Sequence, residues 1–156
     1  RGKRNSTFTE YYQDGVTPRK ETPMQQGKID GTVKTYFRNG KIEAEKEYKQ
    51  SVESGRERRF DSKTGEQIFE SHYIDGKKDG EEWEIFEDAS TLRSRIIRHY
   101  RNGKLDGSYR VESTRDGKPY ITIEGQYTDG EKSGQWIEHN YDNNTQTCTW
   151  HGEGGA

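Results

Sequence analysis

The chain has 156 residues and a formal net charge of −2 at pH 7; 25% of its residues are hydrophobic and 35% are charged. Leu, Ile, Val and Phe together number 21, a proportion typical of disordered chains, which excludes a thick aliphatic core. The near-zero charge and the ten Tyr and three Trp oppose disorder, because each aromatic side chain buries a large area. We therefore expect one folded domain over residues 1–156 with a thin core built from aromatic residues.

The composition also excludes several classes of partner. Balanced charge gives no electrostatic basis for binding nucleic acid, and no apolar run reaches the roughly 20 residues of a transmembrane segment. Cys148 is the single cysteine, so an internal disulfide is excluded. The chain begins at Arg1 without Met, which indicates trimming or processing and leaves both a cytoplasmic and an exported location open.

In chain order, the first element is a partial unit, TEYYQDG at 9–15, within residues 1–23. Strands with period-two alternation follow, among them KIEAEKEY at 41–48 and KPYITIEGQY at 118–127. The last element is a strand in TQTCTWHGE, within a C-terminal capping segment at about 142–153. Between the strands lie six dipeptides that favour two-residue hairpin turns, because both residues tolerate positive φ. They are Asp14-Gly15, Asn39-Gly40, Asp75-Gly76, Asn102-Gly103, Asp116-Gly117 and Asp129-Gly130.

The strands and turns belong to an internal repeat. A second glycine follows most turns, and these marker glycines are spaced by 24, 25, 27 and 27 residues: Gly31, Gly55, Gly80, Gly107 and Gly134. Seven residues before the last four markers lies a tyrosine, and four residues before each tyrosine lies an apolar residue (Ala44, Phe69, Ile96 and Ile123). Such regular spacing indicates stacked supersecondary units. The glycines are therefore interpreted as backbone devices. A phosphate-binding loop would require a helix after the turn, and no helix is expected here.

The segments YIDGKKDGEEW, YRNGKLDGSY and YTDGEKSGQW resemble the MORN repeat in its bacterial variant form. The resemblance covers residues 24 to about 141. Three units depart from the pattern: the Gly55 unit lacks its aromatic residue, the unit at 86–92 carries EDASTL in place of a glycine turn, and the last unit turns through DNNTQ. The resemblance implies an all-β fold, an elongated single-layer antiparallel sheet of tandem β-hairpins. Its open strand edges would allow end-to-end self-association.

The candidate catalytic and metal-binding residues are better explained by structural roles. Glu45, Glu70 and Glu124 share one column, but neighbours in a column lie roughly 10 Å apart on an open sheet, so a solvated face is favoured over a paired-carboxylate site. His72 and His99 are equivalent, and the same spacing argues against a shared zinc ion. Cys148 is interpreted as a half-buried structural thiol, because no His–acid pair is placed to activate it. We expect no catalytic residue, no metal and no cofactor.

The aromatic residues are the candidate binding site. Seven of them follow the repeat and are expected to form a continuous stripe or groove: Tyr48, Tyr73, Trp83, Tyr100, Tyr109, Tyr127 and Trp136. The alternative is that they form only the core of the sheet. Because a single-layer sheet cannot cover its own aromatic face, part of the stripe is expected to stay accessible and to bind a partner.

The favoured function is a non-catalytic module, of bacterial origin, that presents this groove to an unidentified protein or peptide. An extended peptide could also add to an open strand edge. The resemblance implies an alternative, because some variant MORN proteins are antitoxins or immunity partners of a cognate toxin. A lipid-binding or enzyme-accessory role is less favoured, since the sequence has no basic patch.

Overall fold

The computed structural model describes residues 5–87 and 93–152, and every regular element in these ranges is a β-strand. Consecutive strands pair antiparallel, so the predicted all-β fold of hairpin repeats is confirmed. The chain divides into two compact units, residues 1–77 and residues 78–156. The predicted EDASTL turn and GEGGA tail fall largely on residues 88–92 and 153–156, outside the described ranges.

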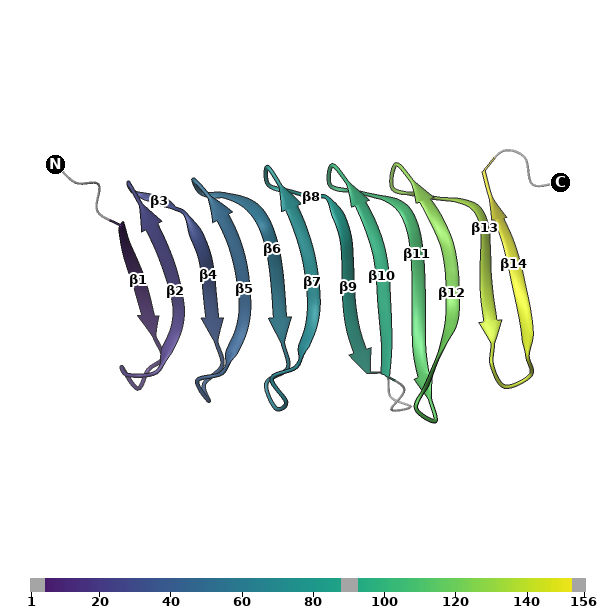
Figure 1. The fold of residues 1–156 in the computed structure, drawn as a ribbon, viewed down its shortest axis with the longest axis horizontal. Coiled ribbons are helices and arrows are strands. Elements are labelled where there is room, and N and C mark those ends of the chain that lie inside the picture. The colour runs from purple at the N-terminus through teal and green to yellow at the C-terminus, as the bar shows by residue number, and fades with distance from the viewer. Residues whose placement is uncertain (1–4, 88–92, 153–156) are drawn as a thin grey trace. The chain divides into compact units, whose positions relative to one another are not determined.

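The first unit is an antiparallel sheet in chain order, β1-β2-β4-β5-β6-β7 (Figure 1). The strands are β1 (Asn5–Tyr11), β2 (Pro18–Gln25), β3 (Lys28–Ile29), β4 (Gly31–Tyr36), β5 (Ile42–Lys49), β6 (Val52–Phe60) and β7 (Gln67–Ile74). The short β3 pairs with β2 beside the main order. The predicted strand at 41–48 therefore corresponds to β5, and the partial N-terminal unit contributes the hairpin of β1 and β2.

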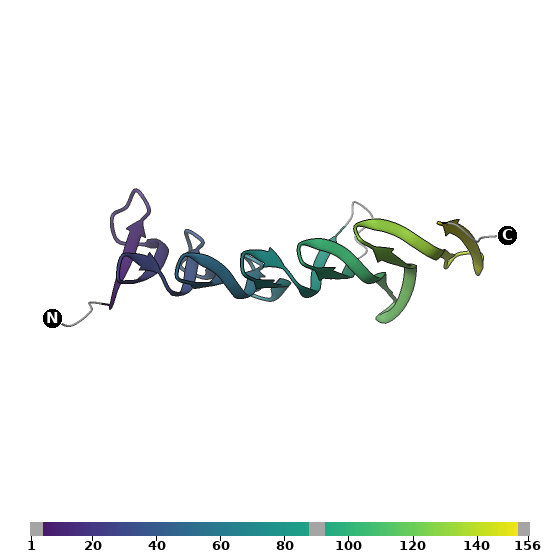
Figure 2. The ribbon, with the colours of Figure 1, turned by 90° about the horizontal axis from the view of Figure 1, so that it is seen from above.

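The second unit repeats the same topology, β9-β10-β11-β12-β13-β14. Its strands are β9 (Gly80–Glu87), β10 (Arg93–Arg101), β11 (Lys104–Arg115), β12 (Lys118–Thr128), β13 (Glu131–Asn140) and β14 (Thr145–His151), and the two-residue β8 (Lys77–Lys78) precedes them. Within each unit the strands form a single layer, and no described element stands against either face of the sheet (Figure 2). The predicted C-terminal capping strand is β14.

Four of the six predicted turns have positive φ at both residues: Asp75-Gly76, Asn102-Gly103, Asp116-Gly117 and Asp129-Gly130. The other two predictions were wrong in turn type. In Asp14-Gly15 and Asn39-Gly40 only the glycine has positive φ. Each of these lies in a longer loop, because the side chain of Asp14 or Asn39 accepts hydrogen bonds from backbone N–H groups two or three residues later.

Two tight turns lack any Asn or Asp and were not predicted, Gln26-Gly27 and Gln50-Ser51. Tight turns that precede a marker glycine are joined to the preceding repeat by backbone hydrogen bonds. Within the second unit, Gly103 N donates to Lys78 O and Gly130 N to Leu105 O, both at 2.8 Å. These bonds stack each repeat on the one before it, as expected when a repeat mainly contacts its neighbours.

All five marker glycines have positive φ, and at Gly31, Gly55 and Gly107 a side chain of the neighbouring strand also approaches closely. Gly107 has φ of 114°, and a Cβ at this position would lie 3.2 Å from the Cβ of His99. A side chain would be strained there both by the backbone conformation and by the neighbour. The period of these glycines is therefore a structural requirement of the repeat, as the sequence indicates.

All buried side chains of the described residues lie on one face of the sheet in each unit. This face is called the inner face and the opposite face the outer face. Strand register places the buried residues in rows that cross successive strands. They are Thr22, Val33, Glu57, Phe69 and Ser71 in the first unit, and Glu82, Ser94, Val111, Ser113 and Trp136 in the second. Only four of these ten are hydrophobic, so the core is thin, as the composition predicts.

Candidate functional site

Three of the predicted aromatic residues form a compact cluster on the inner face of the second unit. The rings of Tyr109, Tyr127 and Trp136 have centroids 5.2–5.7 Å apart. Strands β11, β12 and β13 supply one ring each, and Gly125 leaves room for the indole, which lies over its backbone. Trp136 is 5% exposed and anchors the cluster, whereas the two tyrosines are half-buried. This group is called the aromatic cluster below.

The edge of the aromatic cluster is polar. The Lys132 ammonium lies 4.2 Å from the centroid of the Trp136 ring, and Trp136 Nε1 donates to the carbonyl of Gln126 at 3.1 Å. The ring centroid of His151 in β14 lies 6.3 Å from that of the same indole. Burial raises the pKa of the Tyr109 hydroxyl, so it remains a neutral donor at physiological pH. The cluster is thus a partly covered aromatic surface beside a cationic group, which suits contacts with a polypeptide.

The remaining predicted tyrosines lie on the inner face of their own units and are half-buried. Tyr73 has the Lys46 ammonium 4.5 Å from its ring centroid, and Tyr100 has that of Lys78 at 5.0 Å. Tyr48 lies opposite Gly31 in the register of β4 and β5. The structure therefore gives two of these rings cationic partners from their own unit instead of a continuous stack of aromatic rings.

Trp83 does not share the face of the other six aromatic residues. Side chains alternate along a strand, so Glu82 takes the inner face and Trp83 the outer face of β9. There it pairs in register with Ile97, and the guanidinium of Arg95 lies 4.5 Å from its ring centroid. The expectation of one continuous stripe of seven aromatic residues is corrected. The residue two positions after a marker glycine, called the column position below, takes the inner face, and in this repeat it is Glu82.

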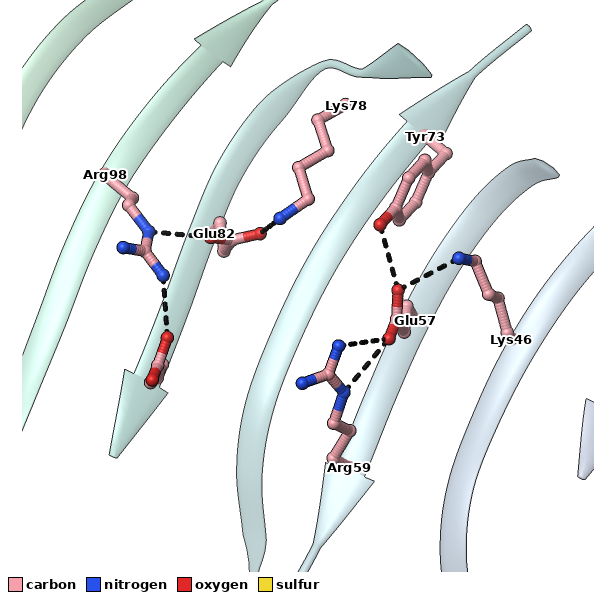
Figure 3. A network of polar contacts seen from close by, with 8 residues as sticks. Lys46, Glu57, Arg59, Tyr73, Lys78, Glu82 and Arg98 are labelled. Atoms are coloured by element: carbon pink, nitrogen blue, oxygen red, sulfur yellow. Dashed lines mark hydrogen bonds and ion pairs between the residues drawn. The ribbon is translucent and has the colours of Figure 1, made fainter. Parts of the chain in front are cut away.

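Buried glutamates are the feature that the sequence did not reveal. Glu57 takes the column position in the first unit and is 7% exposed. It accepts hydrogen bonds from Arg59 Nη2 at 2.7 Å and from the Tyr73 hydroxyl at 3.0 Å, and the Lys46 ammonium lies at 3.3 Å (Figure 3). Lys46 is also held by Glu53 at 2.6 Å. Three strands, β5 to β7, are joined through this one carboxylate.

Glu82 takes the same position in the second unit and is 0% exposed. It accepts from Arg98 Nε at 2.6 Å and from the Lys78 ammonium, while Arg98 also donates to Glu84 at 2.7 Å (Figure 3). Burial and the negative charge of Glu82 raise the pKa of the Tyr100 hydroxyl. A buried carboxylate with several donors is compensated. The sequence does contain a signal for both glutamates. Glu57 lies two residues after Gly55 and Glu82 two residues after Gly80, at the position whose side chain takes the inner face.

The pKa shifts in the Glu57 network favour fixed protonation states. Burial alone would raise the pKa of Glu57, but hydrogen bonds from Arg59 and Tyr73 and the charge of Lys46 lower it below its ordinary value. Burial and the hydrogen bond to Glu57 raise the pKa of Tyr73 to about 12. A permanent acceptor and a permanent donor stabilise the sheet, whereas a general acid or base requires a pKa near the working pH.

A hollow of the second unit lies on the outer face, away from most of the aromatic cluster. It encloses about 510 Å³ and is open to solvent. Ile97 and Ile137 provide apolar lining, and His99, Arg110 and Glu124 provide polar groups. Its ionisable side chains already have partners: Arg110 pairs with Glu112 at 2.9 Å, Glu124 lies 3.2 Å from His139, and His99 lies 3.5 Å from Glu81. Among the predicted aromatic residues, Tyr109 also lines this hollow.

The other residues considered from the sequence lie mainly on the outer face. Glu45 and Glu70 flank Arg58 in register, which makes a ladder of alternating charge. His72 lies 3.5 Å from Glu70, and His99 lies 3.5 Å from Glu81. Within residues 5–87 and 93–152, no three His, Cys, Asp or Glu side chains are placed to hold a metal ion.

Cys148 differs from its prediction. It is exposed and not half-buried, because β14 has only β13 as a described neighbour and Cys148 lies on the outer face, in register with Ile137. The described part of the chain also contains no helix long and apolar enough to cross a membrane.

No family model matches the chain, and neither a curated protein nor a solved structure matches it. The resemblance of its repeats to bacterial MORN repeats therefore stays a prediction.

Proposed function

We propose that this chain is a non-catalytic interaction module that binds a protein or a peptide through the aromatic cluster on the inner face of its second unit. One observation carries the proposal. Tyr109 and Tyr127 are only half-buried, and no described element covers the face on which they lie. Aromatic side chains that remain accessible on an uncovered sheet are typical of protein interfaces.

The construction of the cluster supports a binding role. Trp136 is buried and fixes the two tyrosine rings at 5.2 and 5.3 Å, so little side-chain entropy is lost when a partner contacts them. Their hydroxyl groups and the nearby Lys132 ammonium offer polar contacts at the rim. Tyr and Trp are the residues that most often dominate binding energy, in particular where neighbours shield them from water.

The first unit offers less to a partner at the equivalent place. There the column position is Glu57, whose carboxylate is already bonded to Arg59, Tyr73 and Lys46. Groups that are satisfied within the protein gain little from an additional partner, since any new hydrogen bond replaces an existing one. This contrast favours the second unit as the contact surface.

The nature of the partner follows from the resemblance alone. If the repeats are of the bacterial MORN type, a toxin neutralised by this chain is one such partner, and it would use the same surface. The experiment below does not presuppose either identity, because it begins by finding the partner.

The experiment captures partners from a lysate of the source organism, identifies them, and measures the affinity of the purified pair by calorimetry. Tyr127→Ala is expected to raise the Kd about 30-fold, the equivalent of about 2 kcal/mol. Gln126→Ala is the matched control, because Gln126 precedes Tyr127 in β12 and takes the outer face. Circular dichroism and melting curves first confirm that both variants are folded.

Equal affinities of the parent and of Tyr127→Ala would contradict the proposal. A loss of affinity for Gln126→Ala alone would move the contact surface to the hollow on the outer face, which Gln126 lines.

A further inference from the structure

The strand β14 forms an outer edge of the sheet of the second unit, since β13 is its only neighbour in the described part of the chain. Six of its seven residues are exposed, including Trp150 at 59%. An edge strand presents a row of backbone N–H and C=O groups that can pair with another strand. The question is whether the side chains of β14 prevent or favour such pairing.

β14 has no charged residue to prevent it. Its sequence is TQTCTWH, and it is the one strand of the described ranges without Asp, Glu, Lys or Arg, in a chain in which 35% of residues are charged. Three of its seven residues are Thr, which favours strand structure. Its pairing with β13 is regular over all seven residues, without the register shift found in most other pairings of this unit.

The opposite kind of edge is present in the same chain. β1 forms the outer edge of the first unit, and it carries Glu10 and a register shift between Glu10 and Tyr11. A charge and a bulge are two of the features by which natural sheets block edge-to-edge pairing. β14 lacks both, so the two edges differ in their capacity to pair.

We propose that β14 pairs antiparallel with β14 of a second copy of this chain. The strand is compatible with itself about a two-fold axis at its central residue, Cys148. In that register Cys148 lies opposite its counterpart, Thr147 opposite Thr149, and Gln146 opposite Trp150. No like charges meet, Thr–Thr pairs are favourable across strands, and the exposed indole gains a neighbour. A two-fold axis also closes the assembly as a dimer.

This self-pairing uses the free edge of β14, with Cys148 and Trp150 on the outer face and Thr147 and Thr149 on the inner face. None of the three residues of the aromatic cluster takes part in it, so its test does not rest on the proposed function. The register is specific enough to test with cysteine cross-links, because directly opposed residues have Cβ atoms about 4.5–5.5 Å apart and diagonal neighbours lie farther away.

The first experiment tests the register in the full chain with Cys148→Ser as the background and diamide as the thiol oxidant. A variant with Thr147→Cys is mixed with a variant carrying Thr149→Cys. The mixture is expected to give a disulfide-linked heterodimer, while each variant alone gives much less dimer because its cysteines are then diagonal. Equal cross-linking in the mixture and in the separate samples, or none in any of them, overturns the proposal.

The second experiment measures self-association by sedimentation velocity over a range of concentrations under reducing conditions. The parent and Cys148→Ser are expected to show the same dimerisation. Cys148→Lys places two ammonium groups opposite each other at the axis and is expected to raise the dimer dissociation constant at least about tenfold. Because Cys148 is exposed, both variants should keep the melting temperature of the parent at concentrations at which the parent is monomeric. A parent chain that stays monomeric up to millimolar concentration, or a dimer unaffected by Cys148→Lys, overturns the proposal.

Discussion

Replacing Glu82 by Gln tests whether the buried carboxylates stabilise the sheet. Gln keeps the size of the side chain and one carbonyl oxygen, but it removes the negative charge that faces Arg98 and Lys78. Breaking a buried ion pair on one side costs about 3–5 kcal/mol, because the remaining charge is left uncompensated. Since Gln retains one acceptor and Arg98 keeps its bond to Glu84, we expect the lower end, about 3 kcal/mol.

The structure provides a matched control in Glu84. Arg98 donates to Glu82 at 2.6 Å and to Glu84 at 2.7 Å, so the two carboxylates have nearly equal distances to the same guanidinium. They differ in burial: 1% of the Glu82 side chain is exposed but 41% of that of Glu84. Solvent screening reduces the value of an exposed pair, so Glu84→Gln should cost less than about 1 kcal/mol.

Urea denaturation followed by circular dichroism, with linear extrapolation, measures both costs. For a chain of this length a loss of 3 kcal/mol corresponds to a decrease in Tm of about 6–12 °C. If Glu82→Gln and Glu84→Gln prove equally destabilising, burial is not what gives this ion pair its strength. The account of Glu82 as a core residue would then be wrong.

Three further perturbations have expected outcomes. Because the pKa of Glu57 is lowered in the folded state, its contribution to stability is present above the unfolded pKa of about 4.5 and is lost as the pH falls through the folded value. The free energy of unfolding should therefore fall less steeply between pH 6 and pH 3 in Glu57→Gln than in the parent. Gly103→Val should cost about 1–3 kcal/mol in urea denaturation, since φ is 86° at this turn residue, and Gly103→Asn should cost less. Gly125→Ala should cost about 1–3 kcal/mol and change the tryptophan emission spectrum, because the new Cβ would lie 2.3 Å from the Trp136 ring.

Local patterns were sufficient to predict most of the fold. Alternation at 41–48 and 118–127 gave β5 and much of β12, and the Asn-Gly and Asp-Gly dipeptides gave four tight turns. Both signals are local in the sequence. Alternation reflects the two-residue period of a strand, and the turn dipeptides consist of residues that tolerate positive φ. The turn at Gln50-Ser51 was missed, because neither residue favours positive φ. Its backbone bond to Ile29 O at 2.7 Å is contributed by a residue 22 positions earlier.

The candidate site was harder to predict, because it depends on which face each side chain takes. Hydrophobicity predicts Trp83, and not its neighbour Glu82, as the inner-face residue of this strand. A shift of one residue along a strand moves the side chain to the other face. A lone glutamate in a core position is costly unless it is paired. Its partners Arg98 and Lys78 lie on other strands, so they become visible only once the register of β9 and β10 is known.

The column positions now explain why a chain with so few aliphatic residues folds and where it has surface left for a partner. From the first repeat to the last they are Val33, Glu57, Glu82, Tyr109 and Trp136. A single-layer sheet has no second layer to cover these side chains, so each must be covered by long side chains from adjacent strands. Arg and Lys side chains cover the two glutamates, and the carboxylates in turn accept hydrogen bonds from the guanidinium and ammonium groups. At the last two positions the cover is aromatic, and the half-buried rings of Tyr109 and Tyr127 retain apolar surface that nothing else in the described chain covers. Because apolar surface is what association with a partner can still remove from water, binding energy is concentrated at this end of the repeat array.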